Sequence, residues 1–132
     1  MKELRIIIAG GRDFNNYNLL HDSVEDIINN KLSEKYTDVD RICIISGTAR
    51  GADTLGEQYA SENNLTLYKF PADWNQYGKR AGFIRNTEMA NFAIKDENYG
   101  ALIAFWDGYS KGTRHMIDIA TTRGLDINII KY

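Results

Sequence analysis

The sequence has one cysteine, one proline and no excess of positive charge. The single cysteine, Cys43, forms no internal disulfide, and its place in an apolar run predicts a small buried residue. The formal net charge of -2 provides no electrostatic footprint for duplex DNA or an anionic membrane. No apolar run approaches a membrane span, and the N-terminus, Met1–Leu4, lacks a signal-peptide pattern. We therefore expect a cytoplasmic protein with no membrane partner.

Metal-ligand patterns are equally scarce. The two histidines, His21 and His115, are isolated from each other and from Cys43, so we expect no metal site and no cofactor. Hydrophobic residues make up 43% and charged residues 26% of the 132 residues, which is the balance of a globular chain. That length predicts one domain, residues 1–132, large enough to bury a core.

Short apolar runs alternate with helical patterns along the whole chain. The predicted strands are 4–9, 41–45, 65–70, 101–106 and 127–130. Helices are predicted between them, with 71–79 as a long loop and Thr113 as the cap of the last helix. This alternation predicts an α/β fold: a Rossmann-like three-layer sandwich around a five-stranded parallel sheet, with expected strand order 3-2-1-4-5. Ligands of such folds bind at the carboxyl ends of the strands, here between strands one and four.

The stretch Ser46–Asp53 joins the second strand to the second helix. Gly47 permits a turn that residues with a Cβ avoid, and Gly51 allows close approach of a ligand to the first N–H groups of the helix. Such a helix end binds phosphate or other anions. A tight turn without any ligand explains the same glycines. Arg50 and Asp53 favour a site, because a turn needs neither.

Cations and aromatic residues recur in or beside the loops after the strands. The cations are Arg12, Arg50, Arg80, Arg85, Arg114, Lys79 and Lys111, and the aromatic residues are Phe14, Trp74, Tyr77, Trp106 and Tyr109. Cationic side chains on an acidic protein suit a small phosphorylated ligand better than a long polyanion, and planar rings suit a nucleobase. Exposed loops are charged in any case, which explains some arginines but not two tryptophans. Of the two, Trp106 at a strand end better fits the core.

Four stretches together resemble the SLOG superfamily, a Rossmann-like group related to the LOG proteins and to DprA, and within it the small YspA-like branch. They are Gly10–Phe14, Ser46–Asp53, Pro71–Trp74 with Gly82–Asn86, and Gly108–Thr113. The resemblance implies a nucleotide-related ligand at the strand ends without fixing a reaction. It also implies that dimers or larger assemblies are common, so a homo-oligomer is compatible with it.

The resemblance further implies roles for individual residues. Arg12 would lie beside the ligand, Arg50 would reach a phosphate or carboxylate, and Asp53 would favour the helix end or accept a bond from a sugar hydroxyl. The candidate ligand-binding residues are Gly10, Gly11, Arg12, Asp13, Ser46, Gly47, Arg50, Gly51, Ala52, Asp53, Arg85, Asn86, Asp107, Gly108, Lys111, Gly112 and Thr113.

Three functions follow from these patterns. The first is binding or sensing of a nucleotide or an ADP-ribose-like ligand. The second is a nucleotide hydrolase or phosphoribohydrolase of LOG type, but those enzymes carry a glutamate three residues after the threonine, where this chain has Met116. A carboxylate substitute is then required, with Asp13, Asp53, Glu88 and Asp107 as equal candidates. The third, DprA-like binding of single-stranded DNA, has the aromatic residues but not the positive charge, and we rank it last.

Overall fold

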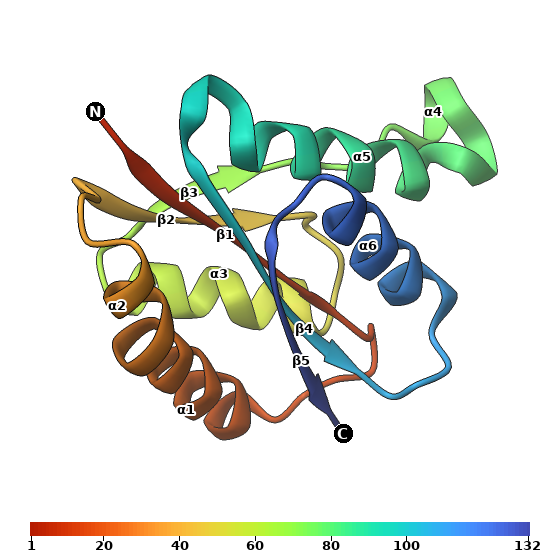
Figure 1. Cartoon of the computed structure of the whole chain (residues 1–132). Coiled ribbons are helices and arrows are strands. Elements are labelled where there is room, and N and C mark those ends of the chain that lie inside the picture. The colour runs from red at the N-terminus through yellow and green to blue at the C-terminus, as the bar shows by residue number, and fades with distance from the viewer.

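The computed structural model describes residues 1–132 and shows a parallel β-sheet between two layers of helices (Figure 1). The strands are β1 (Glu3–Gly10), β2 (Arg41–Ser46), β3 (Thr66–Lys69), β4 (Tyr99–Trp106) and β5 (Asp126–Lys131). Their order is β3-β2-β1-β4-β5, and every neighbouring pair is parallel. The predicted fold class and strand order are therefore confirmed.

The helices follow the predicted alternation, with two differences. They are α1 (Tyr17–Ile27), continued by a π-helical turn η1 (Ile28–Leu32) and α2 (Ser33–Lys35), then α3 (Ala52–Glu62), α4 (Trp74–Tyr77), the 3-10 turn η2 (Gly78–Arg80), α5 (Ala81–Ile94), the 3-10 turn η3 (Lys95–Glu97) and α6 (Lys111–Thr122). The predicted loop 71–79 contains α4, because the Asp73 carboxylate accepts a hydrogen bond from the Gln76 N–H and caps a helical turn. The cap of α6 is Ser110, so the prediction of Thr113 was wrong by one turn.

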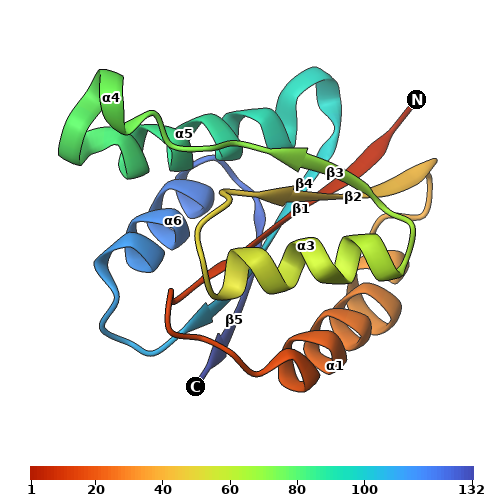
Figure 2. The ribbon, with the colours of Figure 1, turned by 180° about the vertical axis from the view of Figure 1, so that it is seen from behind.

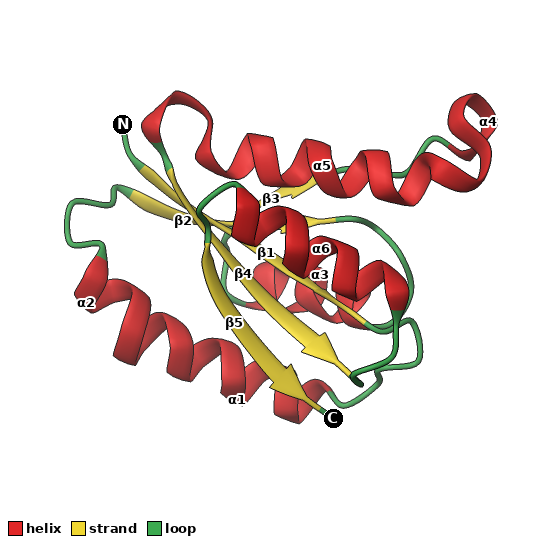
Figure 3. Ribbon diagram, turned by 45° about the vertical axis from the view of Figure 1, so that its right-hand side comes forward, coloured by secondary structure: helices red, strands yellow, loops and turns green.

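The two helical layers meet opposite faces of the sheet, as the views in Figures 2 and 3 show. Successive residues of β1 point to opposite faces of the sheet. Ile6 and Ile8 pack with α1 and α3 on one face, whereas Ile7 and Ala9 pack with α5 and α6 on the other. A central strand that is buried on both faces needs an unbroken apolar sequence, which explains the run in β1. None of the helices combines the length and apolar composition of a membrane span.

The sheet changes winding direction between β1 and β4. The helices α1 and α3, which follow β1 and β2, cover one face, and α6, which follows β4, covers the other. The chain therefore leaves the carboxyl ends of β1 and β4 toward opposite faces. Such a divergence opens a crevice at this edge of the sheet, where ligands of doubly wound folds bind.

Charged side chains at the opposite edge of the sheet are paired with one another. The buried Glu3 carboxylate accepts hydrogen bonds from Arg5, from Arg41 and from the Tyr68 hydroxyl. The Arg5 guanidinium also lies 3.9 Å from the centre of the Phe92 ring. Burial raises the pKa of Glu3, but the hydrogen bonds from these partners outweigh it and hold that pKa below its usual value. The charged side chains at this end of the sheet therefore form a structural network in which each has a hydrogen-bond partner.

Candidate functional site

A cleft with two adjoining chambers lies at the carboxyl ends of the strands. The main chamber has a volume of about 1090 Å³ and is bounded by the loops after β1, β2 and β4 and by α5. A side chamber of about 470 Å³ lies beside it, between the loops after β2 and β3. Five residues line both chambers: Arg12, Ala49, Arg50, Trp74 and Arg85. The two chambers therefore adjoin, with the arginines at their junction.

The loop after β1 is fixed by backbone and aromatic contacts. The Gly11 N–H donates to the Phe105 carbonyl in β4, and the Phe14 ring stacks on Phe105 with 4.9 Å between centroids. The Asp13 carboxylate accepts a hydrogen bond of 2.7 Å from the Tyr132 hydroxyl. Phe14 is therefore a buried anchor of the loop, whereas Arg12 is exposed toward the cleft.

The loop after β2 is held by the first turn of α3. The Thr54 hydroxyl donates to the Ala49 carbonyl at 3.0 Å, while the Ala49 N–H donates to Asp53 Oδ2 at 3.1 Å. The Ser46 hydroxyl accepts from the Thr48 N–H at 3.0 Å. These bonds keep Thr48 at a φ of 64°, a left-handed conformation that is strained for a β-branched residue.

Glycines let the two loops touch. Gly51 has a φ of 82°, and a Cβ there would lie 2.3 Å from the Gly11 carbonyl oxygen, which accepts a hydrogen bond from the Ala52 N–H. Gly51 thus allows contact between the two loops, and it also lines the main chamber. Gly47 is not the left-handed residue of the turn, since Thr48 takes that role. A Cβ on Gly47 would instead lie 2.8 Å from Arg85 Nη1 and 2.9 Å from Asp53 Oδ2.

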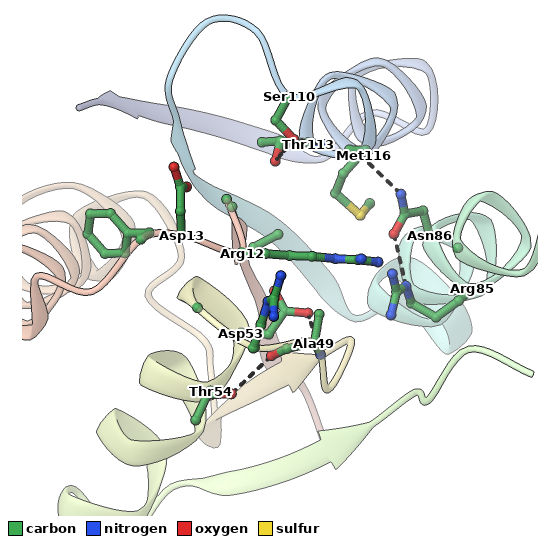
Figure 4. Close-up of a pocket in the computed structure, with 18 of the residues that line it drawn as sticks. Arg12, Asp13, Ala49, Asp53, Thr54, Arg85, Asn86, Ser110, Thr113 and Met116 are labelled. Carbon is green, nitrogen blue, oxygen red and sulfur yellow. Dashed lines mark hydrogen bonds between the residues drawn. The ribbon is translucent and has the colours of Figure 1, made fainter. Parts of the chain in front are cut away.

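Two arginines approach the cleft from opposite walls. Arg85, on α5, donates from Nη1 to the Gly47 carbonyl and from Nε to Asn86 Oδ1. Figure 4 shows Arg12 extending across the chamber toward Arg85 and Asn86. Burial lowers the pKa of Arg85, and the charge of Arg12 lowers it further, while Asp53 opposes this shift. In every ion pair of the protein, the nitrogen and the oxygen lie within 4.0 Å of each other, and neither Arg12 nor Arg85 has a carboxylate oxygen at that distance.

Asp53 is the buried carboxyl group of the main chamber, with 6% of the residue exposed. Burial raises the pKa of Asp53 to about 6, against the hydrogen bond from Ala49 and the charges of Arg85 and Arg12, which lower it. Its Oδ2 accepts the Ala49 N–H, so Oδ1 is the oxygen left for a further partner. The chamber thus holds a carboxyl group that changes its charge near neutral pH.

The wall across from Asp53 is the beginning of α6. Asp107 Oδ1 accepts the N–H groups of Tyr109 and Ser110, both at 2.8 Å, which fixes the turn before the helix. These backbone bonds hold the pKa of Asp107 below its usual value. The buried Asn86 amide donates to the Gly112 carbonyl at 3.3 Å, which ties α5 to the first turn of α6.

Aromatic and apolar side chains complete the main chamber. Trp74 and Phe83, exposed by 51% and 46%, stand at its rim, and the Phe83 ring lies 4.5 Å from the His115 ring. Burial lowers the pKa of His115, which favours the neutral form of that ring. Met116 lines the chamber at the position where the LOG resemblance implies a glutamate.

Most of the predicted site residues come together in this cleft. Those lining the main chamber are Gly10, Gly11, Arg12, Asp13, Arg50, Gly51, Asp53, Arg85, Asn86, Asp107, Gly112 and Thr113. Gly47 lines the side chamber. The others line neither chamber: Ser46 and Ala52 are buried, and Gly108 and Lys111 lie outside the cleft.

Other groups differ from the prediction. Of the predicted cations, Arg80, Lys111 and Arg114 are exposed side chains that line neither chamber. Lining residues that sequence reasoning missed include Asn15, Thr54, Phe83, Met89 and Ser110. The N-cap pattern three residues before Thr113 could have identified Ser110. The apolar lining residues Phe83 and Met89 carry no such signal.

The fold and the position of the cleft define a Rossmann-like α/β protein with its cavity at the switch point of the sheet. Residues 4–77 match the model of a family described as the YspA, cpYpsA-related SLOG family, and the chain belongs to that family. This match includes the loops after β1, β2 and β3 but not Arg85 or the start of α6. The Gene 61 protein of Mycobacterium phage D29 is 29% identical over 128 residues, which cover 93% of each chain. No solved structure matches at a significant level.

Proposed function

We propose that the protein binds a nucleotide or a nucleotide-derived phosphorylated ligand in this cleft. The observation that carries the proposal is the approach of Arg12 and Arg85 to one space in which neither forms an ion pair with a carboxylate. Arg5 and Arg41, at the opposite end of the sheet, are paired with Glu3, whereas Arg12 and Arg85 form no ion pair. Facing guanidinium groups repel each other, and a phosphate between them removes that repulsion with charge-assisted hydrogen bonds.

Two further features favour a nucleotide over a simple anion. Trp74 and Phe83 present exposed rings at the rim of the main chamber, where a base can stack. The volume of about 1090 Å³ lies slightly above the usual range of roughly 300–1,000 Å³ for small-molecule sites and far exceeds one phosphate group. The family assignment agrees with a nucleotide-related ligand.

The test is isothermal titration with adenine, guanine, cytosine and uracil nucleoside mono- and diphosphates. Loss of one guanidinium should weaken binding about 10-fold or more, since hydrogen bonds to charged groups contribute about 1.5–3 kcal/mol each. Arg12→Ala and Arg85→Ala should both show this loss. Arg80→Ala is the matched control, because Arg80 lies just before α5 but lines neither chamber. Binding that survives both cleft substitutions unchanged would refute the proposal.

A second candidate, hydrolysis of a nucleotide, is favoured by one observation. Of the four candidate carboxylates, Glu88 does not line the cleft, Asp13 is bonded to Tyr132, and Asp107 holds the α6 turn. Asp53 alone is buried in the chamber with a raised pKa of about 6.

In N-glycosidic cleavage, the Asp53 carboxylate would take a proton from a water molecule while the oxygen of that water forms a bond to the anomeric carbon. The bond to the base breaks, and the base leaves with the electron pair and takes a proton from solvent. Base release by the wild type and its loss in Asp53→Asn, with binding retained, is the expected outcome; no release from any nucleoside monophosphate would eliminate this candidate.

A further inference from the structure

The side chamber offers a place for a second group of the same ligand. It adjoins the main chamber and shares Arg12, Arg50 and Arg85 with it, so the arginines stand between two cavities rather than at the end of one. A ligand whose phosphate ended the molecule would leave the cavity beyond the arginines unfilled. A ligand with a group on both sides of its phosphate fills both.

The residues that belong to the side chamber alone show what kind of group fits there. They are Gly47, Thr48, Pro71 and Ala72, all uncharged. The positive charge of this chamber comes from the three arginines that it shares with the main chamber, so a further phosphate finds no cation beyond them. The shared Trp74 ring provides an apolar face, and the Thr48 side chain provides a hydroxyl. A neutral sugar or base, with one flat face and several hydrogen-bonding edges, matches this lining.

The backbone supports the same assignment. Thr48 is held at a φ of 64°, and strain of this kind is characteristic of ligand clamps. Pro71 lies directly after Phe70, whose N–H donates to the Ser46 carbonyl, so both walls of the side chamber are attached to the sheet. The volume of about 470 Å³ accommodates a group the size of a pentose or a base.

We propose that the ligand is two-ended: a nucleotide in the main chamber, a phosphate bridge between Arg12 and Arg85, and a neutral sugar or second base in the side chamber. This inference rests on the proposed function, because it places the nucleotide in the same cleft. It adds the class of ligand, a nucleotide esterified through its phosphates.

The test compares nucleoside diphosphates with the same diphosphates carrying a sugar, in wild type and in a variant with the side chamber filled. The probe pairs are ADP and ADP-ribose, GDP and GDP-mannose, and UDP and UDP-glucose. Ala72→Trp places a large side chain in the side chamber, and Ala72→Leu is a smaller step should the tryptophan disturb folding. Asn75→Trp is the matched control, since Asn75 is exposed on α4 and lines neither chamber.

For the base that binds, Ala72→Trp should raise the Kd of the sugar-bearing ligand about 10-fold, a loss of about 1.4 kcal/mol. The Kd of the plain diphosphate should change by less than about twofold, and Asn75→Trp should affect neither ligand. If Ala72→Trp weakens both members of a pair equally, or neither, the two-ended ligand is refuted while arginine-dependent nucleotide binding stands. If no probe binds the wild type, or if binding is unchanged in both Arg12→Ala and Arg85→Ala, both proposals are refuted.

Discussion

Replacing Asp53 by asparagine should stabilise the protein, and the gain should grow with pH. Burial raises the pKa of Asp53 from 3.8 to about 6. Since a difference of one in pKa corresponds to about 1.36 kcal/mol, ionising this carboxyl in the folded state costs about 3 kcal/mol more than in the unfolded chain. An asparagine side chain at this position would carry no charge to desolvate, and its oxygen can still accept the Ala49 N–H.

The sign of the pH dependence follows from the direction of the shift. Below pH 3.8 the carboxyl is protonated in both states and imposes no penalty. As the pH rises toward 6, the unfolded chain ionises first, so the folded state loses relative stability, and above pH 6 the full penalty is present. The excess stability of Asp53→Asn over wild type should therefore increase by about 2 kcal/mol between about pH 4.5 and about pH 7.5.

Urea unfolding of both proteins at these two pH values, followed by circular dichroism, measures the difference directly. Asp118→Asn removes the same charge from an exposed position of α6 that lines neither chamber, and it serves as the control for net-charge effects. If the difference in free energy of unfolding between Asp53→Asn and wild type is the same at both pH values, the claim that Asp53 is desolvated in the folded state is refuted.

Three further substitutions test the loops and the opposite sheet edge, each by urea unfolding. Gly51→Ala should destabilise by at least about 2 kcal/mol, because its φ is 82° and its Cβ would lie 2.3 Å from a backbone oxygen; a loss below about 1 kcal/mol would contradict this. Thr48→Gly should raise stability by up to about 1 kcal/mol, since glycine relieves the left-handed strain against a smaller entropic loss; any decrease counts against the strain. Glu3→Ala should cost about 3 kcal/mol, because it leaves Arg5 buried without its carboxylate, yet it should not alter ligand binding in the distant cleft.

The strand order could be predicted because the chain alternates elements of strong and simple patterning. Runs such as Ile6–Ile8 and Ile42–Ile45 have no polar face, which fits only strands covered on both sides. The short helix α4 was missed because a single turn has no periodicity to detect. Its signal was one capping carboxylate, Asp73, in a stretch rich in loop residues.

The site was predictable as a location but not as an arrangement. Glycines and arginines after strands indicated the correct edge of the sheet. Which carboxylate is buried depends on how Gly51 packs on the loop after β1, and this contact links residues about forty positions apart. Sequence spacing therefore gave Asp13, Asp53, Glu88 and Asp107 equal standing, and only the packed structure distinguishes Asp53.

The cleft makes two opposite demands on a ligand. Arg12 and Arg85 favour an anion, whereas Asp53, ionised above about pH 6, repels one and requires a hydrogen-bond donor at Oδ1. A fully deprotonated anion such as sulfate meets the first demand and opposes the second, because it has no hydrogen to donate. A sugar phosphate would meet both, because its phosphate would lie between the guanidinium groups while a sugar hydroxyl would donate to the carboxylate. Discrimination between a sugar phosphate and an anion without a hydrogen-bond donor would then come from Asp53 rather than from the arginines, since an ionised carboxylate repels any anion that offers it no hydrogen bond.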